Sequence, residues 1–353
     1  TSFWGEASIW YNRKSDFPGK GWSPLQPSRP LIALAPMAGI TDAPFRELVH
    51  LVSGGAADFL YTEMISARGI CMQNRATLRM LPSPEEKRVL VQLFGEDPSD
   101  FEEAARLVFL NAPGAIGVDV NAACPVKKVI RNNGGASLAR DIPRLRNILQ
   151  ALRPLTKSAG KKLSLKIRMG WQPSSDEGGT ADPLPVLRLA EECGVDFVAL
   201  HGRTVQQKYA GHADPSVLPG ILNSLSLPLF WTGDIFSPED ALQVCKNYPV
   251  AGVLVARGSL GNPWFFEDFQ RLWSGEIHEP PQHPPGQRMQ VIRLHLDLLL
   301  KVFPPSKVAG QFKKFVAGYT HGLPHAREKR HWILQAQNLE ELEHRLFSTL
   351  QGH

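Results

Sequence analysis

At 353 residues the chain is long enough for one large domain and a smaller one, and its 43% hydrophobic and 21% charged residues are typical of a water-soluble globular protein. Four scattered cysteines without a CxxC pair argue against a disulfide framework or a metal site and indicate a cytoplasmic protein, and no apolar run approaches the roughly 18 residues that span a membrane. The net charge of +5 lies entirely in residues 286–353, which hold ten Lys or Arg and five Asp or Glu, so this end predicts a polyanionic partner unless it is simply a solvated helical surface.

Residues 1–30 contain three tryptophans without a clear period and are predicted to be an irregular extension. From Leu31 onwards, eight short apolar runs alternate with amphipathic stretches. The runs are 31–35, 58–61, 89–94, 117–120, 163–167, 197–200, 229–231 and 252–255, and the plainest helices are 44–52, 100–110, 142–152, 185–193 and 238–246. Continuous apolar strands are typical of a parallel sheet that is buried on both faces.

Eight such units in residues 31–278 predict an α/β fold, a (β/α)8 TIM barrel that carries the catalytic site. The alternative is a doubly wound open sheet. The barrel is favoured because chemically apt polar residues follow many different strands, whereas an open sheet gathers them at one switch point.

A Pro-rich stretch, 279–285, breaks the pattern and is predicted to be a linker. Beyond it, residues 286–353 are predicted to form a small helical bundle with helical runs at 288–302, at 307–318 and from 325 to about 350. Basic residues cluster in this bundle, and Tyr319, His321 and Trp332 are interleaved aromatics of the kind that stack on nucleic-acid bases.

Cys124 follows the apolar run 117–120 and therefore lies on a loop just past the C-terminal end of a strand, where α/β barrels place their chemistry. Asn121 offers an amide donor and acceptor beside this thiol. A free cysteine is more often a small buried hydrophobic residue. From this stretch alone, a reactive thiol and a buried filler residue are equally good interpretations.

Other strand ends carry residues that suit a flat, polar ligand. Pro36, Met37 and Ala38 follow the first strand and let the backbone pass close to a ring. Gln92 and Lys166 interrupt apolar strands, and a buried amide or ammonium needs a partner or an electron-rich ligand. His201 ends the sixth strand at the same level as Lys166 and Cys124.

The last two strands end in small residues with backbone amides and one arginine, which is the usual phosphate cradle of such barrels. The residues concerned are Thr232, Gly233, Asp234, Ala256 and Arg257. Together the strand ends predict a planar, phosphate-bearing cofactor across the barrel mouth, with Cys124 over its reactive face.

Several segments, in order, resemble the tRNA-dihydrouridine synthase family. They are Ala35–Gly39 with Thr41-Asp42, Thr62-Glu63-Met64, Gln92–Gly95, Asp119–Pro125, Lys166–Arg168, His201–Thr204, Gly233–Ile235 and Ala256–Gly258. They cover residues 31–264, and the C-terminal helices resemble the family's appended tRNA-binding domain. Thr232 stands where many members have Asn, but its hydroxyl is compatible with the same ligand.

The resemblance implies an FMN-binding barrel, NADPH as the reductant and tRNA as the substrate. It places FMN against Pro36, Met37, Ala38, Gln92, Lys166, His201, Thr232, Gly233, Asp234, Ala256 and Arg257. It places the target uracil among Asn121, Lys166, Arg168 and His201. In this scheme NADPH reduces the flavin, a hydride goes to C6 of uracil, and Cys124 donates a proton to C5.

A thiol with an ordinary pKa of about 8.5 is mostly protonated at neutral pH and is suited to that role. The basic helices would hold the tRNA, with Lys313, Lys314, Arg327, Lys329 and Arg330 as the contacts, while the target base leaves its stack. The expected protein is a monomer with no bound metal, and the overall pattern leans toward the bacterial subfamily that modifies position 17.

Two other functions compete with this one. A flavin barrel acting on a small pyrimidine would need no basic helical domain. A non-catalytic tRNA-binding chaperone would need no intact set of Cys124, Lys166, Asn121 and His201.

Overall fold

The computed structural model describes residues 29–172 and 181–351, and almost all of the predicted N-terminal extension lies outside them. Eight parallel strands form a closed barrel, because β2 pairs with both β1 and β4. The strands are β1 (Leu31–Leu34), β2 (Phe59–Tyr61), β4 (Val89–Phe94), β5 (Gly117–Ala122), β6 (Lys162–Arg168), β7 (Phe197–His201), β8 (Leu229–Thr232) and β9 (Gly252–Val255). All eight predicted strands are confirmed, and the open-sheet alternative is wrong because the sheet closes. A two-residue strand, β3 (Ile65–Ser66), extends the pairing of β4.

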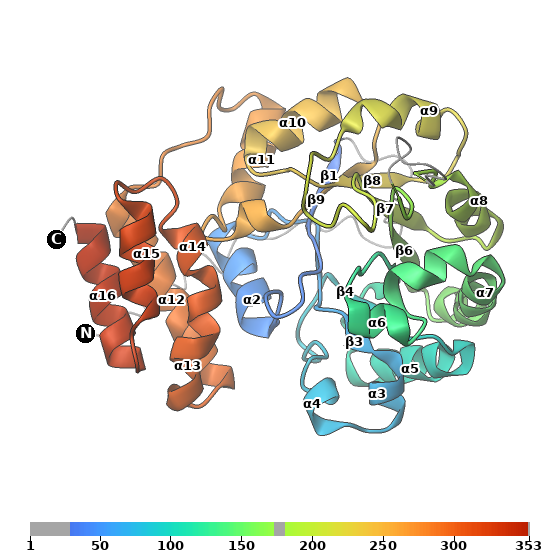
Figure 1. The fold of residues 1–353 in the computed structure, drawn as a ribbon, viewed down its shortest axis with the longest axis horizontal. Helices are drawn as coiled ribbons and strands as arrows, with labels where there is room; N and C mark the ends of the chain where they lie inside the picture. The colour runs from blue at the N-terminus through green and yellow to red at the C-terminus, as the bar shows by residue number, and fades with distance from the viewer. Residues whose placement is uncertain (1–28, 173–180, 352–353) are drawn as a thin grey trace.

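Helices surround the barrel (Figure 1). The longer ones are α2 (Ala43–Val52), α5 (Pro98–Asn111), α7 (Ile142–Ser158), α8 (Leu184–Glu192), α10 (Pro238–Asn247) and α11 (Phe265–Ser274). Short elements between them are α3 (Ala67–Cys71), α4 (Arg75–Leu78), α6 (Lys127–Arg131), η1 (Gly135–Arg140), η2 (Pro215–Val217), α9 (Leu218–Leu222) and η3 (Arg257–Ser259). The five predicted helices are confirmed, but α7 continues past Pro154, whose missing N–H the helix tolerates.

Polar caps start these helices where the sequence provides them. The side chain of Asp42 accepts a hydrogen bond from the Phe45 N–H at the start of α2. Ser237 and Asp240 form a reciprocal capping box at the start of α10. These two caps fix the starts of α2 and α10, the helices that follow β1 and β8.

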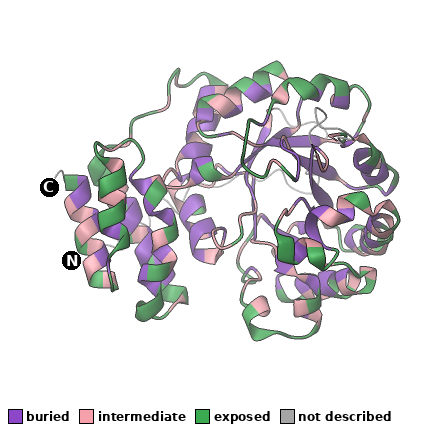
Figure 2. Cartoon of the chain, in the orientation of Figure 1, coloured by how far each residue is buried: buried purple, intermediate pink, exposed green. Residues whose placement is uncertain are grey.

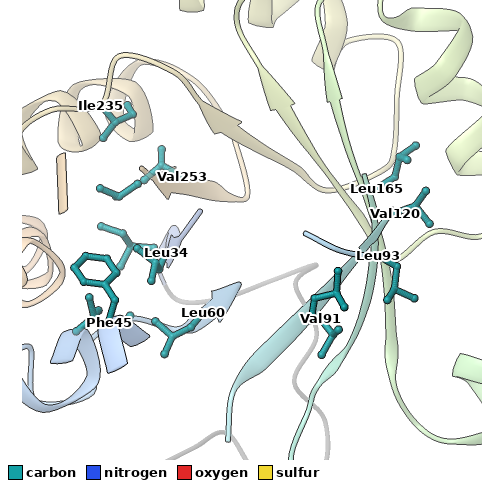
Figure 3. Close-up of a cluster of buried hydrophobic side chains, with 14 of the residues drawn as sticks. Leu34, Phe45, Leu60, Val91, Leu93, Val120, Leu165, Ile235 and Val253 are labelled. Atoms are coloured by element: carbon teal, nitrogen blue, oxygen red, sulfur yellow. The ribbon is translucent and has the colours of Figure 1, made fainter. Parts of the chain in front are cut away.

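Strand side chains alternate between two separate cores, as the two-residue period of a strand requires. The outward set packs against the helices, with Leu34, Val120 and Val253 among its fully buried members (Figure 3). The inward set closes one end of the barrel with aromatic rings. Phe59, Phe197 and Phe230 are all fully buried there, with ring centroids 5.0 to 5.6 Å apart.

The C-terminal helices lie together beside α2 (Figure 1). They are α12 (Pro285–Val302), α13 (Pro305–Phe312), η4 (Lys313–Phe315), α14 (Val316–Tyr319), α15 (Ala326–Leu334) and α16 (Leu339–Gln351). The prediction of one helical run from 325 to about 350 is wrong in its continuity. The chain breaks after Leu334, and the Asn338 side chain accepts from the Glu341 N–H at the start of α16.

The barrel and the C-terminal helices share one core. Phe45 on α2 stacks on Phe315 with a centroid distance of 5.0 Å and lies 5.8 Å from the ring of His295 on α12. Tyr319 is 1% exposed, so the prediction that it stacks on a nucleic-acid base is wrong. Its hydroxyl is 3.1 Å from His295 Nδ1, and burial lowers the pKa of His295 to about 3 and keeps it neutral. Figure 2 shows buried residues on these helices and on α2, whereas α15 is mostly exposed or half-buried.

We expect Phe45→Ala to lower the free energy of unfolding by about 3–5 kcal/mol, because it empties a fully buried ring site between two parts of the chain. Urea unfolding followed by circular dichroism measures the change. Leu110→Ala is the control, because Leu110 is 75% exposed and its truncation should cost less than about 0.5 kcal/mol. A loss for Phe45→Ala as small as that of the control would contradict the shared core.

Candidate functional site

A cavity of about 790 Å³ opens at the C-terminal ends of the barrel strands. Every residue that the sequence predicts for the cofactor, the uracil and the acid lines it. They are Pro36, Met37, Ala38, Gln92, Asn121, Cys124, Lys166, Arg168, His201, Thr232, Gly233, Asp234, Ala256 and Arg257. The strands bring them together because parallel strands present their C-terminal ends to one side of a barrel.

The register of the strands sorts the polar side chains into layers. Gln92, Asp119 and Ser164 are paired across β4, β5 and β6 and lie just above the aromatic floor. Asn121 is paired with Lys166 one layer nearer the mouth. Arg168, His201 and Thr232 follow at the strand ends.

The lowest layer is a connected hydrogen-bond network. Asp119 is fully buried and accepts from Ser164 Oγ at 2.5 Å and from Gln92 Nε2 at 2.8 Å. The Asn121 Nδ2 donates in turn to Gln92 Oε1 at 3.1 Å. Burial raises the pKa of Asp119 to about 6, although the hydrogen bonds from Ser164 and Gln92 lower it in part. The sequence reasoning missed a role for Asp119, and the signal for it was a single carboxylate inside an apolar strand.

The backbone around Cys124 is held on several sides. Asn121 Oδ1 accepts from the N–H groups of Ala123 and Cys124, each at 3.0 Å. Arg168 Nε donates to the Ala123 carbonyl at 3.0 Å, and the Ala136 N–H donates to the Cys124 carbonyl at 3.1 Å. The cysteine is half-buried and faces the cavity, so it is not a filler of the core. Burial raises the pKa of Cys124, so the thiol is protonated at neutral pH.

Lys166 is 8% exposed and brings a positive charge into the cavity. Burial and the neighbouring Arg168 lower its pKa to about 8, while Asp119 and Cys124 act in the opposite direction. The ammonium is therefore mostly charged at neutral pH. Arg168 is also buried, and its Nη1 donates to the carbonyls of Thr204 and Lys208 at 2.9 and 3.1 Å.

His201 is neutral, because burial and the charges of Lys166 and Arg168 lower its pKa to about 2. Its Nδ1 accepts a hydrogen bond from the Arg203 N–H at 3.1 Å. The single ring proton therefore lies on Nε2, and His201 offers a ligand a neutral N–H donor.

The ends of β8 and β9 lie side by side at the cavity, where the sequence predicts a phosphate cradle. Gly233 has φ of 121°, and a Cβ there would lie 2.6 Å from the Cβ of Ala213, so only glycine fits. The Asp234 carboxylate accepts from Arg203 at 2.8 Å and from the Ala213 N–H at 2.9 Å. The Asp234 carboxylate is therefore already hydrogen-bonded by groups of the chain itself. Arg257 is 45% exposed and remains accessible to a phosphate, although it also lies 3.5 Å from Asp234.

The predicted tRNA contacts lie outside the cavity, and their surroundings differ. Lys313 donates to the Ala336 carbonyl at 2.6 Å and is partly buried. Lys314 is exposed, and its Nζ is 3.9 Å from the position of a Cβ built on Gly39, at the cavity edge. Arg327 on α15 is exposed, whereas Lys329 and Arg330 are half-buried. Lys314 therefore joins the basic helices to the rim of the cavity.

Within residues 29–172 and 181–351, no helix is both long and apolar enough to cross a membrane. In the same residues, no group of three or more His, Cys, Asp or Glu side chains is arranged to hold a metal ion.

A sequence model of one protein family, described as dihydrouridine synthase (Dus), matches residues 33–351. The chain is 34% identical over 302 residues to tRNA-dihydrouridine synthase B of Pseudomonas aeruginosa. The aligned region covers 85% of this chain and 86% of the Pseudomonas protein. The chain is 33% identical over 316 residues to the protein of the same name from Shewanella oneidensis, with 89% of each chain covered. Among solved structures, an old yellow enzyme homologue from Zymomonas mobilis is similar with a TM-score of 0.47 and 16% identity, over 75% of this chain and 98% of that one.

Proposed function

The chain belongs to the dihydrouridine synthase family, and on this basis we propose that it reduces the 5,6 double bond of uridines in tRNA to dihydrouridine, with FMN as its bound cofactor and NADPH as its reductant. The observation that carries the proposal is the cavity itself. It brings a protonated thiol, a buried ammonium and a neutral imidazole N–H to one space at the barrel mouth.

The residues of the cavity fit a phosphate-bearing flavin. Arg257 and the backbone around Gly233 suit the phosphate, because the arginine is accessible and the glycine leaves room for close approach. Pro36, Met37 and Ala38 offer an apolar edge for the ring, and Lys166 offers its polar edge a charge. When bound, FMN supplies the hydride that adds to C6 of the uracil.

The chain's own groups position the uracil and move the proton. Cys124 donates its proton to C5, because its thiol stays protonated at neutral pH. Lys166 stabilises the negative charge that develops on the pyrimidine carbonyl. Arg168 and His201 line the same space and orient the base, whereas Asn121 lines it with both ends of its amide engaged by the chain itself.

The test uses the purified chain, NADPH and tRNA transcribed without modifications. Nucleoside mass spectrometry should show uridine converted to a product heavier by two hydrogens, and free uridine should be a poor substrate. Conversion of a free pyrimidine at the same rate as tRNA would point instead to a small-molecule oxidoreductase. Binding of tRNA by a flavin-loaded, NADPH-supplied protein without any product would contradict catalysis.

Lys314→Ala combined with Arg327→Ala is expected to weaken tRNA binding about tenfold and to reduce its salt dependence, because both side chains are exposed on the basic helices. Filter binding at several salt concentrations measures both quantities. Lys157→Ala with Lys246→Ala is the charge-matched control, since those residues lie in the last turns of α7 and α10, away from the cavity. Lys313 is left intact because its ammonium holds the Ala336 carbonyl. Equal affinity of the two double variants would remove these helices from the tRNA interface.

A further inference from the structure

The carboxylate of Asp119 lies at the bottom of the cavity and has no part in the chemistry proposed above. It is fully buried, and both of its oxygens accept hydrogen bonds from neutral groups, Ser164 and Gln92. A buried carboxylate is costly unless it is fully hydrogen-bonded, so an asparagine or an apolar residue would be the cheaper choice for packing alone. An ionised carboxylate differs from an asparagine amide in one respect. Both of its oxygens accept hydrogen bonds, and neither can donate one.

That property determines the orientation of the next side chain in the network. The oxygen and nitrogen of an amide are nearly equal in size, so hydrogen bonding alone decides which way Gln92 points. Facing an acceptor, Gln92 must turn its Nε2 toward Asp119, at 2.8 Å. Its Oε1 then faces Asn121.

The same rule applies once more, one layer nearer the mouth. Because Gln92 presents an oxygen, Asn121 turns its Nδ2 toward it, at 3.1 Å. The Asn121 Oδ1 is thereby left to accept from the N–H groups of Ala123 and Cys124, each at 3.0 Å. A reversed Gln92 would present its Nε2 to the Asn121 Nδ2, and Asn121 would have to reverse to accept from it. A reversed Asn121 would present N–H groups to the N–H groups of Ala123 and Cys124, and both contacts would be lost.

We propose that Asp119 is a positioning residue whose acceptor-only carboxylate orients the Gln92 and Asn121 amides and so holds the backbone of Cys124 in place. Only the catalytic consequence of this proposal rests on the proposed function. That consequence is the orientation of the Cys124 thiol toward the substrate. The orientation itself is a property of the free chain.

This hydrogen-bond relay, which runs from Asp119 through Gln92 to Asn121, also predicts that the hold on the Cys124 backbone depends on pH. Asp119 is ionised at neutral pH and becomes protonated as the pH falls through about 6, because burial raises its pKa. A protonated carboxyl can donate and no longer dictates which way Gln92 turns. The titratable groups around Asp119 are Lys166 on β6 and Tyr61 on β2, and Tyr61 stays protonated because burial and the Asp119 charge raise its pKa.

Amide hydrogen exchange of the peptide that contains Ala123 and Cys124, measured by mass spectrometry on the full chain without substrate, tests the relay. Asp119→Asn keeps the shape of the side chain but allows both amides to reverse, so exchange at these two positions should quicken about tenfold. In the wild-type chain, their protection, corrected for the intrinsic rate, should fall as the pH is lowered through about 6.

Two further variants separate orientation from packing. The double variant Asp119→Asn with Gln92→Glu puts a carboxylate directly opposite Asn121 and should restore the protection of the Ala123 and Cys124 amides from hydrogen exchange. Ser164→Ala removes a hydrogen bond to the same carboxylate but leaves the amide relay intact, so protection should remain as in the wild type.

Unchanged protection of Ala123 and Cys124 in Asp119→Asn overturns the proposal. It is also overturned if the double variant melts like the wild type but does not restore that protection. Should Asp119→Asn not fold, the wild-type pH profile decides, and a flat profile between pH 5 and 8 overturns the proposal. These readouts need no turnover, so they stay informative even where dihydrouridine formation fails. Where turnover is present, Asp119→Asn should lower kcat with little change in KM.

Discussion

Cys124→Ala is expected to lower the rate of dihydrouridine formation by about 10²- to 10⁴-fold, the usual contribution of a positioned general acid. The thiol lies in the cavity, its backbone is fixed by Asn121, and burial raises its pKa so that the proton is present at neutral pH. A single-turnover measurement of dihydrouridine by nucleoside mass spectrometry gives the rate of the step. Binding of FMN and tRNA should be unchanged, because removing one sulfur leaves the rest of the cavity intact.

The matched control is Cys71→Ala. Cys71 is also a partly exposed free cysteine, but it lies on α3 beside Asp100 and does not line the cavity. Turnover of the Cys71→Ala variant should equal that of the wild type. Near-normal turnover of Cys124→Ala would remove the thiol as the proton source and leave water or another side chain in that role.

Lys166→Met is expected to reduce turnover about 10²-fold, the effect of losing one preorganised charge at a developing negative centre. The methionine fills the same buried space in β6 but carries no charge. Lys162→Met on the same strand is the control, because Lys162 lies at the other end of β6 and pairs with Asp196. A fall in turnover shared by both variants would indicate a general effect on the strand.

The pKa of Lys166 also predicts how turnover changes with pH on the alkaline side. Its pKa is lowered to about 8, so its positive charge is present below that pH and is lost as the pH rises through it. Wild-type turnover should therefore decline above about pH 8, and the residual turnover of Lys166→Met should lack this decline. A wild-type decline of the same midpoint that persists in Lys166→Met would assign it to another group.

The strands were predictable because their apolar runs are buried on both faces, and the meeting of Gln92, Cys124, Lys166 and His201 followed from parallel strand direction alone. The network around Asp119 was not predictable in the same way. It depends on which residues become neighbours across β4, β5 and β6, and this register is decided by barrel closure and not by any local pattern.

The C-terminal helices show a second limit. Tyr319 sits among basic residues in the sequence, yet it is buried because helix α14 turns it toward Phe312, with ring centroids 5.5 Å apart. Helical periodicity also continued across residues 335–338, where a polar Asn338 starts a new helix instead. Contacts between helices, and not the sequence around each residue, determine both outcomes.

The aromatic floor of the barrel determines from which side protons reach the site. Phe59, Phe197 and Phe230 close the barrel below Asp119, so among the described residues the barrel interior offers protons no polar route from that end. Protons therefore reach Cys124 from the side of the mouth, where the Lys166 ammonium lines the same cavity. On the proposed function, the substrate and the protons that restore the thiol enter by the same opening.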